Sequence, residues 1–137
     1  TSNGYSTLWL AEAVKRLDGR VTTIERDEKK ISLAEANFQR AGLSPWIILL
    51  AGEVGSLFPS LPTAGYQLIF LDSDRQHYQG WWPEIQRLLA PRGLLVVDNA
   101  ISHESEMRDW MAQVRRDPDF LTSLVPVGKG EFLVVRR

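Results

Sequence analysis

Two stretches of the sequence place oxygen-bearing side chains directly after apolar runs. Asp72 follows the apolar residues 66–71, and Asp98 and Asn99 follow the apolar residues 94–97. If both runs are buried strands, these side chains stand at the carboxyl end of a sheet, where open α/β folds bind ligands. Carboxylate and amide oxygens without sulfur favour Mg²⁺ or Ca²⁺ over zinc. The alternative is that the acids cap helices, as aspartate often does where a strand leads into a helix.

The composition limits the classes of protein to which the chain can belong. Its 137 residues carry a formal net charge of -1, which gives no electrostatic case for binding nucleic acid. It has no cysteine, so disulfides, thiolate metal sites and a cysteine nucleophile are excluded. No apolar run approaches the roughly 18 residues of a membrane span, and no signal peptide is visible. We therefore expect a soluble, cytoplasmic domain with no membrane partner.

Helical and strand patterns alternate along most of the chain. This order predicts an α/β fold with a doubly wound, mostly parallel sheet, closed by an antiparallel hairpin at the C-terminal end. The expected helices are residues 8–17, 27–41, 78–89 and 104–116, and the expected strands are residues 21–25, 46–50, 66–71, 94–98, 121–127 and 131–135. The aromatic residues Tyr78, Trp81 and Trp82 stand at helical spacing, which favours core packing over a substrate pocket.

The first residues form a small polar loop that opens directly onto a helix. A loop of this kind should follow a strand. The strand expected before it would be central, between the strands that end in Glu25 and Asp72. We therefore predict a single domain, residues 1–137, that lacks its N-terminal part and its first strand. The alternative is that the two flanking strands pair with each other.

The same loop, together with Glu25, suggests a site for a nucleoside. Small residues let a backbone approach a ligand, and the start of the following helix offers free N–H groups. Glu25 comes 21 residues after Gly4, where an acid is suited to accept hydrogen bonds from ribose hydroxyls. The loop lacks a second close glycine and a lysine, so it does not predict a nucleoside triphosphate site. The alternative is an ordinary turn and a solvated acid.

The stretches Phe70-Leu71-Asp72-Ser73-Asp74-Arg75-Gln76-His77-Tyr78 and Leu95-Val96-Val97-Asp98-Asn99 resemble a known family. The chain is similar, over almost its whole length, to the class I S-adenosylmethionine-dependent O-methyltransferases, in the branch of catechol and caffeoyl-CoA O-methyltransferases. The resemblance implies that S-adenosylmethionine is bound by Ser2, Asn3, Gly4, Tyr5, Ser6, Glu25, Gly52, Glu53 and Asp72. It also implies that a divalent metal, usually Mg²⁺, is held by Asp72, Asp98 and Asn99.

The resemblance further implies a substrate class and a reaction. Members of this family methylate small aromatic vicinal diols, which they bind through the metal. Coordination lowers the pKa of the hydroxyl and fixes its oxygen in line with the methyl group of the cofactor. The N-terminal region of the family contributes to substrate binding and to a homodimer when the protein is full length.

Arg75 is a departure from the family pattern. A lysine that serves as general base is common there, whereas arginine stays protonated and cannot accept the proton. Either the metal acidifies the substrate sufficiently, or His77 or His103 takes the proton, or the reaction differs; each histidine alone is more often a surface or helix-capping residue. The residues assigned to catalysis are Asp72, Arg75 and His103. Arg75 could instead replace the metal as a fixed cation beside Asp72 and Asp98. A metal-independent methyltransferase, a non-catalytic cofactor-binding domain and, as a weaker rival, an oxidoreductase of the same fold remain alternatives.

Overall fold

Strands and helices alternate in the computed structural model, which describes all residues from 1 to 137. The contacts divide the chain into two units, residues 1–59 and residues 60–137. The helices are α1 (Tyr5–Lys15), α2 (Glu28–Arg40), α3 (Val54–Leu57), α4 (Tyr78–Leu88) and α5 (Glu104–Arg116). The strands are β1 (Val21–Glu25), β2 (Ile47–Ala51), β3 (Tyr66–Leu71), β4 (Leu89–Val97), β5 (Phe120–Val125) and β6 (Glu131–Arg136). No helix has the length and hydrophobicity that a membrane crossing requires.

The first unit is built on the parallel pair β1–β2, whose register aligns Val21 with Ile47 and Glu25 with Ala51. Helix α2 begins at a capping residue, because the carboxylate of Asp27 accepts hydrogen bonds from the first free N–H groups of the helix. Its apolar residues, of which Ala34 and Phe38 are fully buried, face the strand pair. The carboxyl end of β1 lies next to the N-terminal loop, because Thr1 donates hydrogen bonds to the carbonyl of Ile24.

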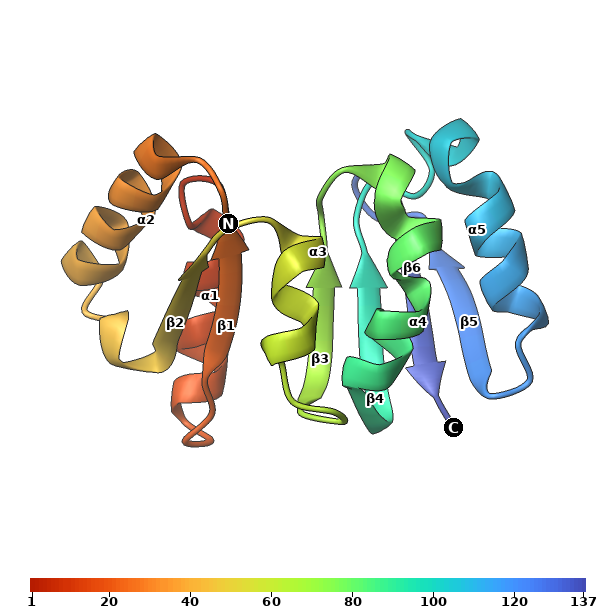
Figure 1. Ribbon diagram of the computed structural model, residues 1–137, viewed down its shortest axis with the longest axis horizontal. Helices are drawn as coiled ribbons and strands as arrows, with labels where there is room; N and C mark the ends of the chain where they lie inside the picture. Colours follow the sequence, from red (N-terminus) through yellow and green to blue (C-terminus); the bar gives the residue numbers. More distant parts are fainter. The chain divides into compact units, whose positions relative to one another are not determined.

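The second unit is built on a four-stranded sheet with the order β3-β4-β6-β5, which Figure 1 shows side by side. Strands β3 and β4 are parallel, and β4–β6 and β6–β5 are antiparallel. The predicted closing hairpin is therefore confirmed. The strand expected over residues 94–98 begins earlier in the structure, because β4 starts at Leu89 and residues 91–93 lie inside it as an irregularity. Tyr66 pairs with Leu89, whereas Leu68 pairs with Leu94.

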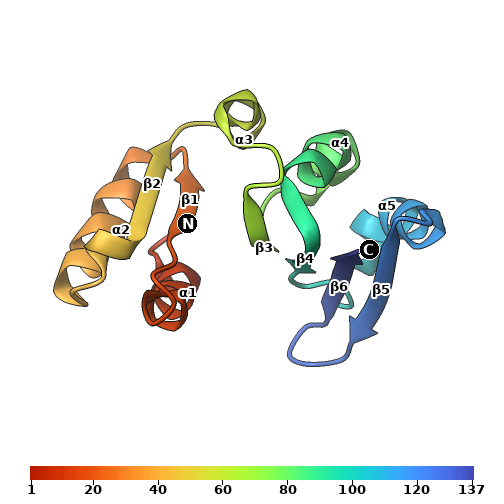
Figure 2. The ribbon, with the colours of Figure 1, turned by 90° about the horizontal axis from the view of Figure 1, so that it is seen from below.

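Helices α4 and α5 lie on the same face of this sheet (Figure 2). Aromatic side chains fill the space beneath them. Trp110 of α5 makes edge-on contacts with Tyr78 and Trp82 of α4 and with Phe132 of β6. All four side chains are at most 3% exposed. The prediction that Tyr78 and Trp82 belong to the core is confirmed, and this core holds the start of α4 against α5.

One expectation about the sheet is wrong, one alternative is excluded, and the expectation of a single domain stays a prediction. Strand β3 is not buried on both faces, since Leu68 and Phe70 are 40% and 37% exposed. The reason is that the helices of its own unit cover one face only. The strands β1 and β3 do not pair with each other, because β1 pairs with β2 and β3 pairs with β4 in separate sheets. The prediction of one domain over residues 1–137 stays a prediction.

Candidate functional site

Glu25 ties the N-terminal loop to the end of β1. Its Oε2 accepts a hydrogen bond from the main-chain N–H of Ser2 at 2.8 Å, and its Oε1 accepts from Arg26 and Asp27. Partial burial tends to raise the pKa of Glu25, but these three N–H donors outweigh burial and lower the pKa below 4.5. The carboxylate is therefore charged at neutral pH and holds the N-terminal loop in place. The sequence predicted that this loop and Glu25 together form a site for a nucleoside.

At Gly4 the loop approaches Phe38 more closely than a residue with a side chain could. Gly4 has φ 88°, and a Cβ atom there would lie 2.5 Å from a ring carbon of Phe38. Asn37 of α2 donates to the carbonyl of Asn3 at 2.8 Å, and Asn3 Oδ1 accepts from the N–H of Tyr5 at 3.2 Å. The loop thus has one fixed conformation at the start of α1, with Tyr5 and Ser6 exposed in the first turn.

The segment after β2 meets the same end of β1. The N–H of Gly52 donates to the carbonyl of Glu25 at 2.8 Å, and Gly52 adopts φ 146°, which favours glycine. Glu53 forms an exposed ion pair with Arg26, with Nη1 and Oε1 2.7 Å apart. The structure therefore brings together Ser2, Glu25, Gly52 and Glu53, all of which the sequence assigned to the cofactor.

In the second unit, a tight turn carries Asp98 and Asn99. Asp98 N–H donates to the carbonyl of Leu71 at 3.1 Å, which places Asp98 beside the end of β3. Asn99 is in the left-handed region at φ 65° and is only 9% exposed. Its main chain is fully engaged, because the N–H donates to the Asp98 carboxylate and the carbonyl accepts from His103. These contacts fix the main chain of Asn99 in the turn next to Asp98.

The loop between β5 and β6 fastens this turn from the other side. Carbonyl oxygens of Lys129 and Gly130 accept hydrogen bonds from the N–H groups of Ala100, Ile101 and Ser102 at 2.8–3.1 Å. A Cβ atom at Gly130 would lie 2.7 Å from the main-chain nitrogen of Ile101, so only glycine fits there. The position of Asp98 and Asn99 therefore depends on a loop about 30 residues later in the chain.

Glu131, which the sequence analysis did not single out, adds a third carboxyl to Asp72 and Asp98. Burial, the nearby charge of Asp98, a hydrogen bond to the Asp98 carboxyl and the charge of Asp72 together raise the pKa of Glu131 to about 7. Two carboxyls can share a hydrogen bond only while one holds a proton. Glu131 Oε2 is buried and has no other hydrogen-bond partner. The three acids Asp72, Asp98 and Glu131 therefore include one buried oxygen, Oε2 of Glu131, to which no group donates a hydrogen bond.

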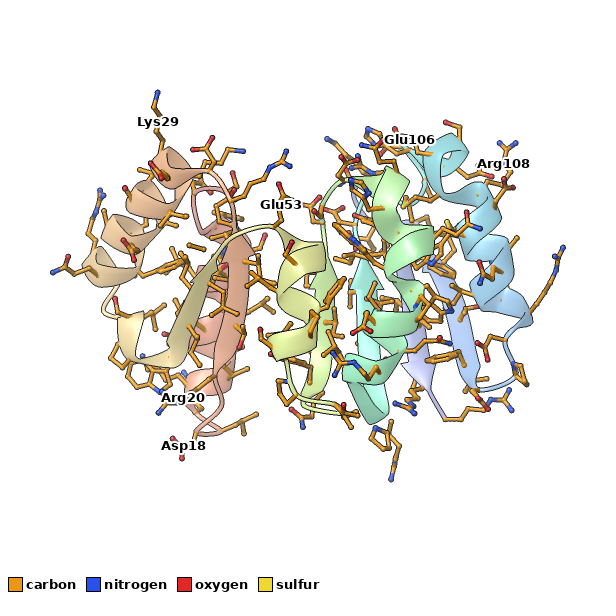
Figure 3. All side chains as sticks on the ribbon, viewed as in Figure 1. Asp18, Arg20, Lys29, Glu53, Glu106 and Arg108 are labelled. Carbon is orange, nitrogen blue, oxygen red and sulfur yellow. The ribbon has the colours of Figure 1, made fainter.

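Arg75 forms its ion pair with Glu106 and not with these acids. Its Nη1 is 3.9 Å from Glu106 Oε2 of α5, and its side chain is 18% exposed. Its Nε is buried without a hydrogen-bond partner. Figure 3 shows Glu106 at the N-terminal end of α5 and Arg108 on the outer side of the helix. The geometry favours the hypothesis that Arg75 pairs with Glu106 over the hypothesis that it replaces a metal.

Tyr78 holds the loop that carries Asp72 and Arg75. Its hydroxyl accepts a hydrogen bond from the N–H of Ser73 at 2.8 Å and donates one to the Ser73 carbonyl at 3.1 Å. Burial raises the pKa of Tyr78, although the Ser73 N–H and the positive charge of Arg75 oppose it. The neutral hydroxyl therefore acts as a structural clamp on the loop after β3.

The two histidines stand in different surroundings. His103 Nδ1 shares a hydrogen bond of 2.9 Å with Ser102 Oγ, and its Nε2 is 4.0 Å from Glu106 Oε1. His77 lies 3.7 Å from Asp74 and stacks on Trp81. His103 belongs to the segment that follows Asn99 directly. Its main-chain N–H donates to the carbonyl of Asn99 at 3.0 Å, so His103 is joined to the turn that carries Asp98 and Asn99.

The chemistry of the donor set fits a hard divalent cation. Asp72, Asp98 and Asn99 supply only oxygen ligands, and the orphaned Oε2 of Glu131 adds a negative group that no donor satisfies. No three His, Cys, Asp or Glu side chains surround a common point in the structure. The predicted ligand set, with two carboxylates and one amide, stays a prediction that this donor chemistry supports.

Comparison with known proteins adds independent information about the chain. A family model described as O-methyltransferase matches residues 1–137. The chain is 36% identical over 104 residues to a catechol O-methyltransferase of Niastella koreensis, a match that covers 74% of this chain and 47% of that protein. A catechol O-methyltransferase of Mycobacterium tuberculosis is 33% identical over 101 residues, covering 74% and 46% of the two chains. The chain thus spans about half the length of these two relatives.

A solved structure shares the fold of the chain. It is the cofactor-bound Rv0187 from MTB, which matches with a TM-score of 0.91 and 26% sequence identity. The match covers 100% of this chain and 70% of that one. The predicted fold class is therefore confirmed.

Proposed function

The chain belongs to the O-methyltransferase family, and from this premise we propose that it transfers a methyl group from S-adenosylmethionine to a hydroxyl of a small aromatic diol, with assistance from Mg²⁺. The observation that carries the proposal is the placement of hard oxygen donors. Asp72, Asp98 and Asn99 follow two adjacent parallel strands, with Asp98 hydrogen-bonded to the end of β3. The diol is part of the proposal because two curated relatives are named catechol O-methyltransferases.

Residues of the first unit bind the methyl donor in this proposal. The loop Ser2–Ser6 and the start of α1 contact the methionine portion, where the N–H groups of the helix start can meet a carboxylate. Glu25 accepts hydrogen bonds from the ribose hydroxyls through lone pairs that the N–H of Ser2 leaves free. Gly52 and Glu53 line the adenine side. The loop needs little rearrangement, because Glu25 already holds it.

Residues of the second unit bind and orient the methyl acceptor. Bound magnesium would lower the pKa of a coordinated hydroxyl and supply positive charge where the oxygen becomes anionic. Asp72, Asp98 and Asn99 would hold it. His103 accepts the hydroxyl proton through Nε2, and the hydrogen bond between Nδ1 and Ser102 orients its ring. The hydroxyl oxygen then forms a bond to the methyl carbon, and the bond from that carbon to the sulfonium sulfur breaks.

Calorimetry and a turnover assay test the proposal together. S-adenosylmethionine is expected to bind to the chain and NAD is not. Catechol should be methylated in the presence of Mg²⁺, and a chelator should abolish turnover until Mg²⁺ is restored. Binding of NAD in preference to S-adenosylmethionine would refute the assignment to methyl transfer.

A metal-independent methyltransferase of the same fold is the second candidate. The feature that favours it is Arg75, a permanent positive charge three residues after Asp72. Full turnover in chelator would select this candidate and would leave the role of Glu25 in cofactor binding unchanged. The proposal also keeps the cytoplasmic location predicted from the sequence.

A further inference from the structure

The register of the sheet places Glu131 directly across from Asp98. Strands β4 and β6 are antiparallel, and Val97 pairs with Phe132. One step further along both strands, Asp98 faces Glu131. On the other side of β4, the parallel register aligns Leu71 with Val97, so Asp72 stands beside Asp98. The three carboxyls therefore follow one another across three adjacent strands.

Such an arrangement is unfavourable unless a positive group compensates it. Like charges directly opposite each other on neighbouring strands destabilise a sheet. The side chains that act on the Glu131 carboxyl are Asp98 and Asp72, which are both acidic. Its Oε2 is buried and has no hydrogen-bond donor. The nearest basic residue in the loop after β3 is Arg75, and its ion pair is with Glu106.

We propose that Glu131 is part of the divalent-cation site, where its carboxylate accepts a hydrogen bond from a water on the ion held by Asp72, Asp98 and Asn99. This inference rests on the proposed function, because it needs the ion. A role through water follows from two facts. The carboxyls do not surround one point, and Mg²⁺ usually keeps several of its waters. Glu131 is then a positioning residue that strengthens cation binding through its charge and its buried oxygen.

The competing explanation is structural. Glu131 could serve only to share a proton with Asp98 and so fix the start of β6. The two explanations differ in what the negative charge does. A structural partner is replaced well by glutamine, which has the same shape and can donate a hydrogen bond to Asp98. Glutamine cannot replace a group that attracts a cation, because it removes the negative charge.

Binding of Mn²⁺ to the 137-residue chain separates the two explanations. Mn²⁺ is titrated at pH 8, and the free ion is measured by electron paramagnetic resonance, for the wild type, Glu131→Gln and Glu131→Asp. Glu104→Gln is the matched control, because it removes one acid from an exposed ion pair on α5, where Glu104 lies 3.4 Å from Arg108. Circular dichroism of each variant checks that it is folded.

The wild type and the control are expected to bind Mn²⁺ equally well. Glu131→Gln should bind it about 10–100-fold more weakly, as is typical when a group that orients a metal site is lost. Glu131→Asp keeps the charge and should bind more tightly than Glu131→Gln. Wild-type affinity in Glu131→Gln would overturn the inference, and so would an equal loss in Glu104→Gln.

Failure of the proposed function gives a different result. If the wild type binds no Mn²⁺ at millimolar concentration, both the metal-assisted reaction and the role of Glu131 are overturned. If the wild type binds Mn²⁺ and all variants bind it equally, only the role of Glu131 is overturned. If Glu131→Gln does not fold, equal binding by Glu131→Asp and by a folded Glu131→Ala overturns the role of the charge.

Discussion

Replacing Glu131 with glutamine should stabilise the chain without metal at alkaline pH. The pKa of Glu131 is raised from 4.5 to about 7. At about 1.4 kcal/mol for each pKa unit, ionising Glu131 in the folded chain costs about 3 kcal/mol more than in the unfolded chain. This is an upper value, because the side chain is partly exposed and water screens the charges. Glutamine has the shape of the protonated acid and avoids the penalty.

The sign of the pH dependence follows from the direction of the pKa change. A carboxyl with a raised pKa in the folded state contributes fully to stability below pH 4.5 and loses that contribution as the pH rises through about 7. The wild type should therefore lose stability relative to Glu131→Gln between about pH 5 and pH 8. Near pH 4.5 the two proteins should be nearly equal.

Urea unfolding in chelator, at several values between pH 4.5 and pH 8.5, measures this difference. Near-ultraviolet circular dichroism of the buried Tyr78, Trp82 and Trp110 reports on the unit that contains Glu131. Glu104→Gln again serves as the control, since its side chain is exposed and its variant should follow the wild type. A difference between the wild type and Glu131→Gln that stays constant with pH would refute the charge argument. A less stable Glu131→Gln at pH 8 would do the same.

Further results are expected for four variants. Glu25→Gln should weaken S-adenosylmethionine binding in calorimetry by about 1–3 kcal/mol, the range for a lost hydrogen bond to a charged group, whereas the exposed Glu28→Gln should not. The stability that the Glu25 carboxylate contributes should be present above pH 4.5 and be lost as the pH falls through its lowered pKa, so the unfolding free energies of the wild type and Glu25→Gln should converge in acid. Asp72→Ala should abolish turnover while calorimetry still detects S-adenosylmethionine binding; retained turnover would exclude Asp72 from the site. Gly4→Ala should lower both the melting temperature and the cofactor affinity, because its Cβ would lie 2.5 Å from a buried aromatic ring. Arg75→Ala should leave Mn²⁺ affinity nearly unchanged, and a tenfold tighter binding would instead mean that Arg75 neutralises the acids.

Local patterns predicted much of the fold because each element carries its own signals. The apolar spacing and the termini of residues 104–116 gave helix α5 with its bounds, and Asp27 caps α2 as expected. The positions after β3 and β4 were also predictable, because the carboxyl ends of parallel strands meet at one edge. Asp98 and the end of β3 are joined by a hydrogen bond. The contact of Glu25 with the N-terminal loop was predictable from the spacing between Gly4 and Glu25.

Features that depend on distant parts of the chain were not predictable in the same way. Glu131 comes to lie across from Asp98 through the antiparallel register of β4 and β6, and no local signal encodes which residue of a hairpin faces Asp98. The only hint is an acid immediately after a glycine at the start of an apolar strand. The exposure of Leu68 and Phe70 has a similar cause. A run of apolar residues shows that a strand can be buried on both faces, but what covers each face is decided elsewhere in the chain.

The arginine at position 75 is best understood through the charges around it. A guanidinium cannot release its proton, so it cannot alternate between base and counter-ion as a lysine can. Its ion pair is with Glu106 of α5, and the charges that act on Glu131 are those of Asp98 and Asp72. The demand for a cation at these acids is therefore greater than the two predicted carboxylate ligands alone would create. An arginine at this position and a third acid on β6 are thus compatible with the proposed cation site, in which we expect His103 to accept the proton.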